Sequence, residues 1–560
     1  MYDRWTISGY DREKAVQHCR RGLNPMVSVI LASRGLEDAS ELTKDDISLL
    51  SDPMSLKDMD RAAERVRVAI DRGEHVAVYG DYDVDGITAS CVVADYLRRR
   101  GLTCDIYIPE RLEEGYGVKS AALDTIKAQG AGLVITVDCG ITAVEEAEHA
   151  KEIGLDMVIT DHHECGDRLP DAMAAVDPKR PDCPSPAKTL AGVGVAFKLI
   201  CAVEGPGSEE RLLDTYGDLV ACGTIADVMP VTGENRVLIK RGLERIGAGS
   251  RPGLRELMSA AGLEGKYPTV TSVGFILAPR INAAGRIGRA EVAVELLLTD
   301  NAAEAASLAG ELCAMNRERQ CIEGAMFKEA LDMLAKDPPD GKPIVLASDR
   351  WHQGVCGIVA SKLVDRFGLP AVMICLKDGV GRGSCRSVEG FNLFDALSAH
   401  RELLLNFGGH EMAAGLTVEK DSVDALRRAL GESFAALPEK ICERVLHVDF
   451  EVIKPELLSM ANIDAMAALE PYGAGNPQPV LCMMDVLVEN AVSLSDGRHS
   501  KLWVSKRGEV FEAIFFSKSL QDLGACTGVR ADVAFYPQIN EFRGRRSVQL
   551  NLVDFRLRES

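Results

Sequence analysis

The sequence predicts an α/β protein with a mostly parallel sheet, followed by a smaller α/β domain and a β-barrel at the carboxyl end. Two observations predict the layered parts. Short apolar runs alternate with amphipathic helical segments from about residue 61, and this alternation starts again at residue 342. The third observation is a change after about residue 445, where short β-rich runs alternate with polar turns, as is typical of a small barrel.

The first α/β domain can be predicted element by element. Residues 61–73 are expected to form an amphipathic helix that ends at Gly73, and His75–Gly80 is an apolar run suited to a buried parallel strand. The next helix and three strands are expected at 86–100, 104–108, 134–138 and 157–161. A strand–helix alternation of this kind indicates helices on both faces of the sheet.

A long helical tract without strand signals covers about residues 290–335 and indicates a connector between the two α/β domains. We therefore expect an amino-terminal segment, a first α/β domain, a helical connector, a second α/β domain and a barrel, at 1–55, 56–289, 290–338, 339–438 and 445–560.

Composition places the chain among ordinary globular proteins. Its 560 residues are enough for three to four domains, and its 46% apolar and 26% charged residues exclude a disordered, collagen-like or coiled-coil protein. No apolar run approaches the roughly 18 to 20 residues of a membrane helix, and the first residues do not resemble a secretory signal. The sixteen scattered cysteines, without a CxxC pair, favour reduced thiols. We expect a cytoplasmic protein that does not associate with membranes.

The net charge of −20 argues weakly against a nucleic-acid partner, because such proteins are often basic. The charge is unevenly distributed. Residues 481–560 carry 11 basic and 10 acidic side chains, so the acidity belongs to the first 480 residues.

Part of that acidity is concentrated where a predicted strand ends. Asp81, Asp83 and Asp85 alternate along the sequence and would point to one side in extended geometry. Such packed carboxylates repel one another unless a cation neutralises them. A calcium loop is the simpler alternative, as is a solvated acidic turn. However, the twelfth position counted from Asp81 is Val92, where a calcium loop has a bidentate Glu. The motif alone favours a metal site.

Further candidate ligands follow other predicted strands. Asp138 ends one strand, and Asp161, His162 and His163 follow the next, at the edge where open parallel sheets bind ligands. Asp227 stands in a later segment, 223–228. Carboxylates and imidazole without sulfur suit Mn²⁺ or Mg²⁺ better than Zn²⁺. Several acids together suit two ions about 4 Å apart, an arrangement used in phosphoryl transfer.

These motifs resemble those of the DHH phosphoesterase superfamily in their order and approximate spacing. They are GDYDVDG (80–86), VDCG (137–140), TDHH (160–163) and GTIADVMP (223–230). The segments NFGGH (406–410) and AAG (413–415) are similar to the companion DHHA1 domain. The whole set from about residue 55 to 557 resembles the RecJ family of single-strand-specific DNA exonucleases. The more specific matches are IPER (108–111), PRINAAGR (279–286), WHQGV (351–355), LEPYG (469–473) and RRSVQL (545–550).

The resemblance implies that two divalent ions are held by the metal ligands Asp83, Asp85, Asp138, His162 and Asp227. Asp138 would bridge the ions, Asp81 would be a ligand or support the ligands, and Asp161 would orient the imidazole. His163 would contact the scissile phosphate. All eight side chains are therefore candidate catalytic residues for two-metal hydrolysis of phosphodiesters, in a fold that combines a DHH domain, a DHHA1 domain and an OB-fold barrel.

The resemblance also implies a grip on a 5′-terminal phosphate, which would set 5′→3′ polarity and the release of 5′-mononucleotides. The candidate phosphate- and DNA-binding residues are Arg111, Arg280, Ser384, Arg386, His410, Arg543, Arg545 and Arg546. The segment GRGSCRS (381–387) offers glycines that let backbone amides approach a phosphate; taken alone, it is equally typical of a flexible loop. Likewise, Gly408 and Gly409 before His410 are compatible with a helix-capping turn.

The carboxyl-terminal barrel combines aromatic and basic residues. Residues 481–560 hold 8 of the 29 aromatics, about twice their share by length. Aromatic faces stack on bases while cations follow the backbone. We nevertheless expect at least half of these rings in the barrel core, because strand alternation buries one face.

Two other functions are compatible with parts of the pattern. A DHH hydrolase of short oligonucleotides or cyclic dinucleotides would usually end after the DHHA1 domain. A non-catalytic RecJ-like replication scaffold would typically have lost acidic ligands, which are all present here. The family further implies a role in DNA repair and recombination, with single-stranded DNA as substrate and a helicase and a single-strand-binding protein as partners.

Overall fold

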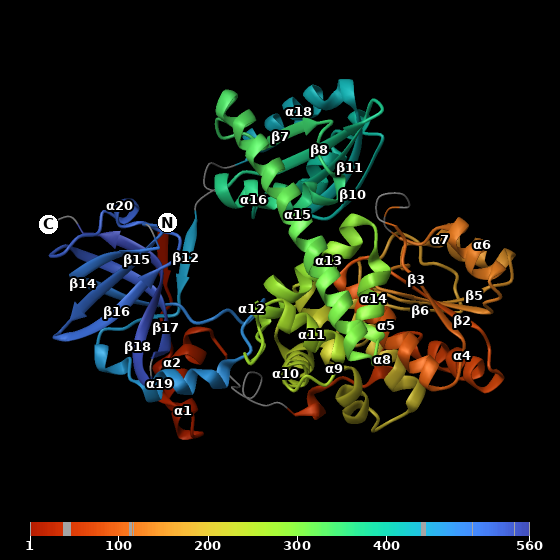
Figure 1. Cartoon of the computed structure of the whole chain (residues 1–560), viewed down its shortest axis with the longest axis horizontal. Coiled ribbons are helices and arrows are strands. Elements are labelled where there is room, and N and C mark those ends of the chain that lie inside the picture. Colours follow the sequence, from red (N-terminus) through yellow and green to blue (C-terminus); the bar gives the residue numbers. More distant parts are fainter. Residues whose placement is uncertain are drawn as a thin grey trace. The chain divides into compact units, whose positions relative to one another are not determined.

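The structure is a computed structural model that describes residues 2–36, 46–110, 115, 117–437, 444–495, 497–542 and 544–558 (Figure 1). Internal contacts divide the chain into two units. The first comprises 1–46, 230–236 and 443–560, and the second comprises 47–229 and 237–442. Within the described ranges, no helix is both long enough and apolar enough to cross a membrane.

The second unit contains the predicted parallel sheet. Its strand order is β3-β2-β4-β5-β6, and every neighbouring pair is parallel. The strands are β2 (Val76–Gly80), β3 (Cys104–Tyr107), β4 (Leu133–Val137), β5 (Asp156–Thr160) and β6 (Ala174–Val176). After β2 the chain passes to β3 on one side, and β4 then begins on the other side of β2. The carboxyl ends of β2 and β4 therefore lie at the point where the strand order reverses, which is where open α/β sheets bind ligands.

Helices cover both faces of this sheet, as the sequence predicts (Figure 1). Helices α6 and α7 pack on one face through small and apolar residues, and α4, α5 and α8 lie on the other. Their bounds are α4 (Met59–Arg72), α5 (Val84–Arg99), α6 (Ser120–Ala128), α7 (Val144–Glu152) and α8 (Gly192–Glu204). Gly73 ends α4 at φ 63°, a left-handed conformation that favours glycine.

A helical region follows. Its helices are α9 (Glu209–Ala226), α10 (Gly233–Gly247), α11 (Pro252–Ala260), α12 (Val270–Ser272), the π-helix η3 (Val273–Leu277), α13 (Ala278–Ile287), α14 (Ala290–Leu298) and α15 (Ala302–Lys336). The predicted connector is confirmed in α15, which packs against α11, α13 and α14 and also against α16 of the next domain.

The second sheet has the order β10-β11-β9-β8-β7 and is mixed, with β7 and β8 parallel and the other pairs antiparallel. Its strands are β7 (Ile344–Ser348), β8 (Ala371–Lys377), β9 (Val380–Arg386), β10 (Asn406–Gly409) and β11 (Ala413–Glu419). The accompanying helices are α16 (Gln353–Phe367), α17 (Leu393–Ser398) and α18 (Val423–Ala435).

The first unit contains the predicted barrel. Five strands close into a ring in the order β14-β15-β16-β18-β17, because β17 also pairs with β14. They are β14 (Leu481–Leu494), β15 (His499–Lys506), β16 (Glu509–Phe515), β17 (Arg530–Phe542) and β18 (Arg545–Leu557), with β13 (Phe450–Glu451) beside β14 and short helices α19 (Met460–Ala465) and α20 (Leu520–Leu523).

The amino-terminal segment, for which the sequence indicates no role, packs on this barrel. Strand β1 (Arg4–Ile7) pairs in parallel with β12 (Val445–Val448). Helices α1 (Arg12–Arg20) and α2 (Pro25–Ser33) follow, and α2 inserts Met26, Ile30 and Leu31 into the barrel core. The first residues of the chain are thus part of the same hydrophobic core as the last strands.

Candidate metal centre

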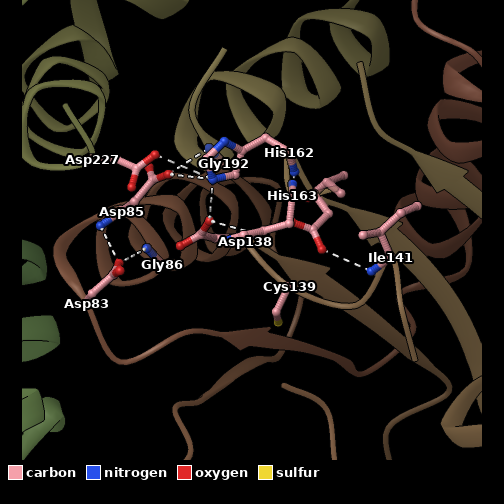
Figure 2. A network of polar contacts seen from close by, with 12 residues as sticks. Asp83, Asp85, Gly86, Asp138, Cys139, Ile141, His162, His163, Gly192 and Asp227 are labelled. Atoms are coloured by element: carbon pink, nitrogen blue, oxygen red, sulfur yellow. Dashed lines mark hydrogen bonds and ion pairs between the residues drawn. The ribbon is translucent and has the colours of Figure 1, made fainter. Parts of the chain in front are cut away.

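The turn between β2 and α5 carries the first three carboxylates. Asp83 caps α5, and its Oδ1 accepts hydrogen bonds from the backbone amides of Asp85 (2.9 Å) and Gly86 (3.1 Å) (Figure 2). A Cβ at Gly86 would come within 2.5 Å of the Asp81 backbone, so the tight turn requires a glycine there. The amide of Val84 donates to Oδ1 of Asn282 (3.1 Å), which ties the start of α5 to α13.

Asp85 is held by the start of α8. Its side chain is 1% exposed, and its two oxygens accept from the backbone amides of Gly192 (2.7 Å) and Val193 (2.9 Å). A helix amino terminus stabilises a carboxylate through these amides and its dipole. Gly192 also touches the next ligand, since a Cβ there would lie 2.6 Å from Cβ and Oδ1 of Asp138. The sequence therefore needs glycine at residue 192 to bring Asp85 and Asp138 together.

The ends of β4 and β5 supply the other side of the site. Asp138 follows β4 at φ 59°, and Asp161 follows β5. The carboxylate of Asp161 accepts hydrogen bonds from neighbouring groups of the protein. Its Oδ2 accepts from the amide of Ile141 (2.9 Å), and its Oδ1 accepts from the amide of His162 (2.7 Å) and from Nδ1 of His163 (2.8 Å). Asp161 thus fixes the ring of His163 and the backbone at His162.

His162 is the point at which the carboxylates meet (Figure 2). Its Nε2 lies 3.1 Å from Oδ1 of Asp138, 3.7 Å from Oδ2 of Asp85 and 3.6 Å from Oδ2 of Asp227. Asp227 directly follows α9, whose last turns pack beside α5. Side chains that are 146 residues apart in the sequence, from Asp81 to Asp227, are thereby brought to one edge of the sheet.

Burial and mutual repulsion affect the protonation of the carboxylates. Burial, together with the charges of Asp227 and Asp83, holds the pKa of Asp85 well above its ordinary value. Burial and then the charge of Asp85 do the same to the pKa of Asp138. Burial and the charge of Asp83 raise the pKa of Asp227 to about 7. Each of these groups is costly to ionise beside the others, and a bound cation would remove that cost.

The pKa values of the two histidines are shifted in opposite directions. Burial and the positive charge of His163 lower the pKa of His162 to about 3, so its ring is neutral at pH 7, the form that binds metals. Burial alone would lower the pKa of His163, but the hydrogen bond and charge of Asp161 raise it to about 9. Burial would raise the pKa of Asp161, yet the hydrogen bond with His163 holds it below its ordinary value. His163 and Asp161 are therefore a charged pair.

The residues present fit divalent cations. Nε2 of His162 and Oδ1 of Asp138 are buried, and neither atom makes a hydrogen bond with a described residue despite their separation of 3.1 Å. Ligand atoms lie within 4.8 Å of one another in three groups, which are Asp81, Asp83 and Asp138; Asp85, His162 and Asp227; and Asp138, His162 and His163. Asp138 belongs to two groups, as a bridging ligand would. Carboxylate and imidazole donors without thiolate suit Mn²⁺ or Mg²⁺.

Sequence reasoning missed several residues that shape this centre. No sequence pattern indicates Gly192 or Val193, and Asn282 belongs only to the motif PRINAAGR (279–286). Lys179, which follows β6, was also missed, although its positive charge helps to lower the pKa of His162 and offsets part of the rise in the pKa of Asp227. The segment AAVDPK (174–179) is a short apolar run with polar residues at its carboxyl end, the same signal that identified Asp138 and Asp161.

In the glycine-rich segment 381–387, residues 381–386 form a strand and not a loop. They lie in β9 between β8 and β11, so their backbone amides are used within the sheet. Strand alternation places Ser384 and Arg386 on one face and Cys385 on the other, where Cys385 is fully buried in the core. Phosphate contact at this strand would therefore come from side chains, and the intervening Cys385 serves packing.

Glycines keep the sheet face beside Ser384 open. Ser384 pairs across the ladder with Gly415, and Gly415 pairs with Gly408. Among the described residues, no heavy atom lies within 4 Å of a Cβ position at Gly408, and at Gly415 the nearest is a carbonyl oxygen at 3.9 Å. His410 is exposed and sits in the turn between β10 and β11, where its amide donates to the Ala413 carbonyl (2.9 Å). This turn joins two strands and does not cap a helix.

The arginines predicted to bind phosphate or DNA are scattered. Arg111 and Arg543 lie outside the described residues. Arg280 lies in α13, where its Nη1 donates to the carbonyl of Ile276 (2.5 Å). Arg545 and Arg546 begin β18 and are exposed, and Nη2 of Arg546 is 2.8 Å from Oδ1 of Asp464.

The barrel buries about half of the aromatic residues that the sequence offers. Phe511, Phe515 and Phe535 lie in its core, whereas Phe516 is 55% exposed. Trp503 is partly exposed, and Nζ of Lys501 lies over its ring at 4.9 Å from the centroid. These exposed rings, and not the barrel as a whole, remain available for contacts.

Comparison with known proteins agrees with this architecture. Three family models match the chain: the DHH family, N-terminal domain, over residues 75–224; the DHHA1 domain over 340–436; and the RecJ OB domain over 448–554. The single-stranded-DNA-specific exonuclease RecJ of Bacillus subtilis (strain 168) is 41% identical over 98% of this chain and 70% of its own length. RecJ of Escherichia coli (strain K12) is 36% identical over 94% of this chain and 95% of its own length.

The chain belongs to the RecJ family. Solved structures extend the match to the three-dimensional fold. The crystal structure of RecJ in complex with Mn²⁺ from Thermus thermophilus aligns with a TM-score of 0.85 at 33% identity, covering 100% of this chain and 80% of that one. The Mg²⁺ complex of the same protein gives 0.80 at 32% identity, covering 100% and 79%. The RecJ resemblance and the predicted DHH, DHHA1 and OB-fold architecture are confirmed.

Proposed function

We propose that this chain is a single-strand-specific DNA exonuclease that uses two divalent ions, Mn²⁺ or Mg²⁺, to hydrolyse phosphodiesters from the 5′ end and release 5′-mononucleotides. One observation carries the proposal. Five carboxylates and two imidazoles converge at the strand-order reversal of the parallel sheet, with His162 within 3.7 Å of three of the carboxylates. Membership of the RecJ family supports a metal-dependent nuclease with single-stranded DNA as its substrate.

In this proposal, Asp83, Asp85, Asp138, His162 and Asp227 hold the ions. When bound, two divalent ions stabilise the attacking and leaving oxygens of an in-line displacement. The chain's own contribution is positioning. The amides of α8 fix both oxygens of Asp85, and Asp161 fixes the ring of His163. His163 has a side chain that is 44% exposed and a pKa of about 9, so a charged imidazolium faces solvent beside the cluster and can bind the scissile phosphate.

The 5′→3′ direction is proposed to come from the second α/β domain. Ser384 and Arg386 share one face of β9, and both lie close to α16. A Cβ at Gly357 would be 3.3 Å from Nη2 of Arg386 and 3.7 Å from Cβ of Ser384. A hydroxyl and a guanidinium side by side are suited to a terminal phosphate, which has more oxygens and charge than an internal one. Arg111 and Arg280 complete this proposed grip through the family resemblance.

The cellular setting is proposed from family membership. DNA repair and recombination supply single strands with free ends, and a helicase and a single-strand-binding protein are the partners we expect there. A cytoplasmic location agrees with the cysteines, since all fifteen in the described part of the chain are free.

The test uses a single-stranded oligonucleotide of about 60 nucleotides, several times the length of strand that one OB fold binds. It is labelled at either end, with Mn²⁺, Mg²⁺ or EDTA, and a blunt duplex serves as control. Metal-dependent loss that begins at the 5′ end of single strands alone is the expected result. Binding without cleavage in any metal would contradict the proposal and indicate a scaffold. Cleavage confined to di- to pentanucleotides would contradict it in favour of a small-substrate hydrolase.

A further inference from the structure

Two strongly exposed apolar side chains lie on segments near the end of α9, the helix that Asp227 directly follows: Val228 comes next after Asp227, and Phe275 is in η3, which packs against α9. Phe275 is 80% exposed and Val228 is 71% exposed, more than any other large apolar side chain in the described part of the chain. Single exposed apolar residues are ordinary, but the backbones that carry these two both lie near one residue, Ile225. Ile225 is the shared neighbour. The amide of Val228 donates to the carbonyl of Ile225 (3.1 Å). The Cβ position of Gly274, which precedes Phe275, lies 3.4 Å from Cγ2 of Ile225.

The backbone at Val228 is strained. Its φ is 57°, a left-handed conformation that β-branched residues rarely adopt. Asp227, the candidate metal ligand, immediately precedes it. Strained residues persist where the surrounding structure holds them in place, and they cluster at functional sites. Here the strained residue carries an exposed side chain directly beside a ligand.

Phe275 lies in a second unusual segment. The π-helix η3 spans Val273–Leu277 and continues into α13, and short π-helical turns are frequent at functional sites. Arg280, for which the family resemblance implies phosphate binding, reaches back to this turn, because its Nη1 donates to the carbonyl of Ile276. One helical segment thus presents an exposed aromatic ring and a guanidinium within five residues, the combination with which proteins bind single-stranded nucleic acid.

We propose that Phe275, together with Val228, is a platform on which an unpaired base stacks as the strand enters the metal centre. The inference rests on the proposed function and identifies how that site holds its substrate. Stacking on an aromatic ring tolerates any base, as an exonuclease without sequence preference requires. In a duplex both faces of an internal base are already covered by its neighbours. The platform therefore favours single strands by contact.

The test compares intact and abasic substrates. A 5′-phosphorylated single strand is prepared intact and with one tetrahydrofuran residue at each of the first four positions. The wild-type enzyme should lose about 5- to 100-fold in kcat/KM at one of these positions, the range of base–aromatic stacking. Phe275→Ala should lose a similar factor on the intact strand and discriminate against that abasic position no further. Equal slowing of intact and abasic strands by Phe275→Ala would overturn the proposal.

Two further variants distinguish the effect of the aromatic face of Phe275 from the effect of its apolar volume. Phe275→Trp keeps an aromatic face and should keep wild-type discrimination, whereas Phe275→Leu keeps an apolar side chain and should behave like Phe275→Ala. Because the ring is exposed, none of these changes disturbs a packed core. Full activity and discrimination in Phe275→Leu would overturn a stacking role.

A binding measurement keeps this test independent of catalysis. Strands that carry 2-aminopurine at the sensitive position are titrated with protein in EDTA, where no cleavage occurs. Wild-type protein should change the fluorescence of that base, and Phe275→Ala should not. An equal change with both proteins would contradict the platform. Failure of the proposed function would appear differently, as a wild-type protein that leaves the intact strand uncut in Mn²⁺.

Discussion

The metal centre and the barrel use their acidic side chains in opposite ways. In the barrel unit, acids pair with the chain's own cations, as Asp449 does with Arg34 (2.8 Å), Asp485 with Arg530 (2.8 Å) and Asp532 with Arg558 (2.6 Å). In the metal centre, Asp85, Asp138 and Asp227 have only imidazoles as ion-pair partners among the described residues.

This difference explains why a chain with net charge −20 can act on DNA. Carboxylates that the protein does not pair with its own cations are stabilised when external cations bind to them, and bound divalent ions would reverse the local charge near the DNA. Carboxylates that are paired with arginine do not need an external cation. Pairing, more than the number of acids, distinguishes a metal site from a solvated acidic surface.

The largest effect is expected when one unpaired carboxylate charge is removed from the metal centre. Asp138→Asn keeps the shape of the side chain but removes the negative charge of a residue shared by two groups. We expect a loss of about 10³-fold in kcat, since electrostatic stabilisation of the transition state is the largest catalytic contribution. The measurement is single-turnover degradation of a 5′-labelled strand in Mn²⁺, together with Mn²⁺ affinity by calorimetry.

Asp105→Asn is the matched control. Asp105 is 52% exposed on β3 and pairs with His75, so its loss should change activity by no more than about twofold. If Asp138→Asn retained more than a tenth of wild-type activity, the uncompensated acids would not be the catalytic centre.

A subtler change alters geometry and keeps every charge. Gly192→Ala places a Cβ 2.6 Å from Asp138, so Asp138 or α8 must shift. Small displacements of catalytic groups cost up to about 10²-fold, and we expect a loss of about 10- to 100-fold with a higher Mn²⁺ requirement. Activity as a function of Mn²⁺ concentration measures both effects.

Gly310→Ala in α15 is the control, because no heavy atom lies within 4 Å of its Cβ position among the described residues. A helix-interior alanine there should leave activity unchanged and add about 0.5 to 1 kcal/mol of stability. Equal effects of the two substitutions would show that the tight contact at Gly192 has no functional consequence.

On the barrel, the comparison predicts which arginines bind DNA. Arg546 is already 2.8 Å from Asp464, whereas Arg545 has no carboxylate partner among the described residues. Arg545→Ala should therefore weaken binding of a long single strand more than Arg546→Ala, by a few-fold, and make its salt dependence shallower by about one phosphate contact.

Arg530→Ala, which breaks the pair with Asp485, is the control and should leave the salt dependence unchanged. Fluorescence anisotropy in EDTA at several salt concentrations gives both quantities, and the opposite order of Arg545 and Arg546 would contradict the pairing argument.

The sequence predicts the two regions unequally, for a physical reason. Asp81, Asp138 and Asp161 could be found because parallel strands are continuous apolar runs, and polar residues at their carboxyl ends meet at one edge. The amides of Gly192 and Val193 could not be found, since a backbone group leaves no mark in composition. The strand at 381–386 was obscured by its glycines. They are depleted in most strands, but here they make room for neighbouring side chains, such as Leu416 against Gly383.

In the barrel, alternation predicts that some rings are buried but not which ones, because register is set by strand pairing over long sequence separations. The amino-terminal helix α2 in the barrel core is the extreme case. Its apolar residues Met26, Ile30 and Leu31 indicate a buried helix, but nothing local identifies a partner more than 400 residues away.

The smallest predicted effect concerns a buried carboxylate outside the proposed ligand set. Asp177 is 0% exposed, and burial, together with the charge of Asp161, raises its pKa to about 7. A carboxyl with a raised folded-state pKa favours the native state most when it is protonated. Its contribution is full below the unfolded value near 4 and is lost as the pH rises through about 7.

Asp177→Asn should therefore be more stable than the wild type at pH 8 by about 1 to 3 kcal/mol and nearly equal to it at pH 4. Asn keeps an oxygen for the amide of Lys179, which donates to Oδ1 of Asp177 (2.6 Å). Urea denaturation in EDTA at both pH values measures the difference. A variant that is less stable at pH 8 would mean that this acid, like those of the barrel, is already compensated by the chain's own cations.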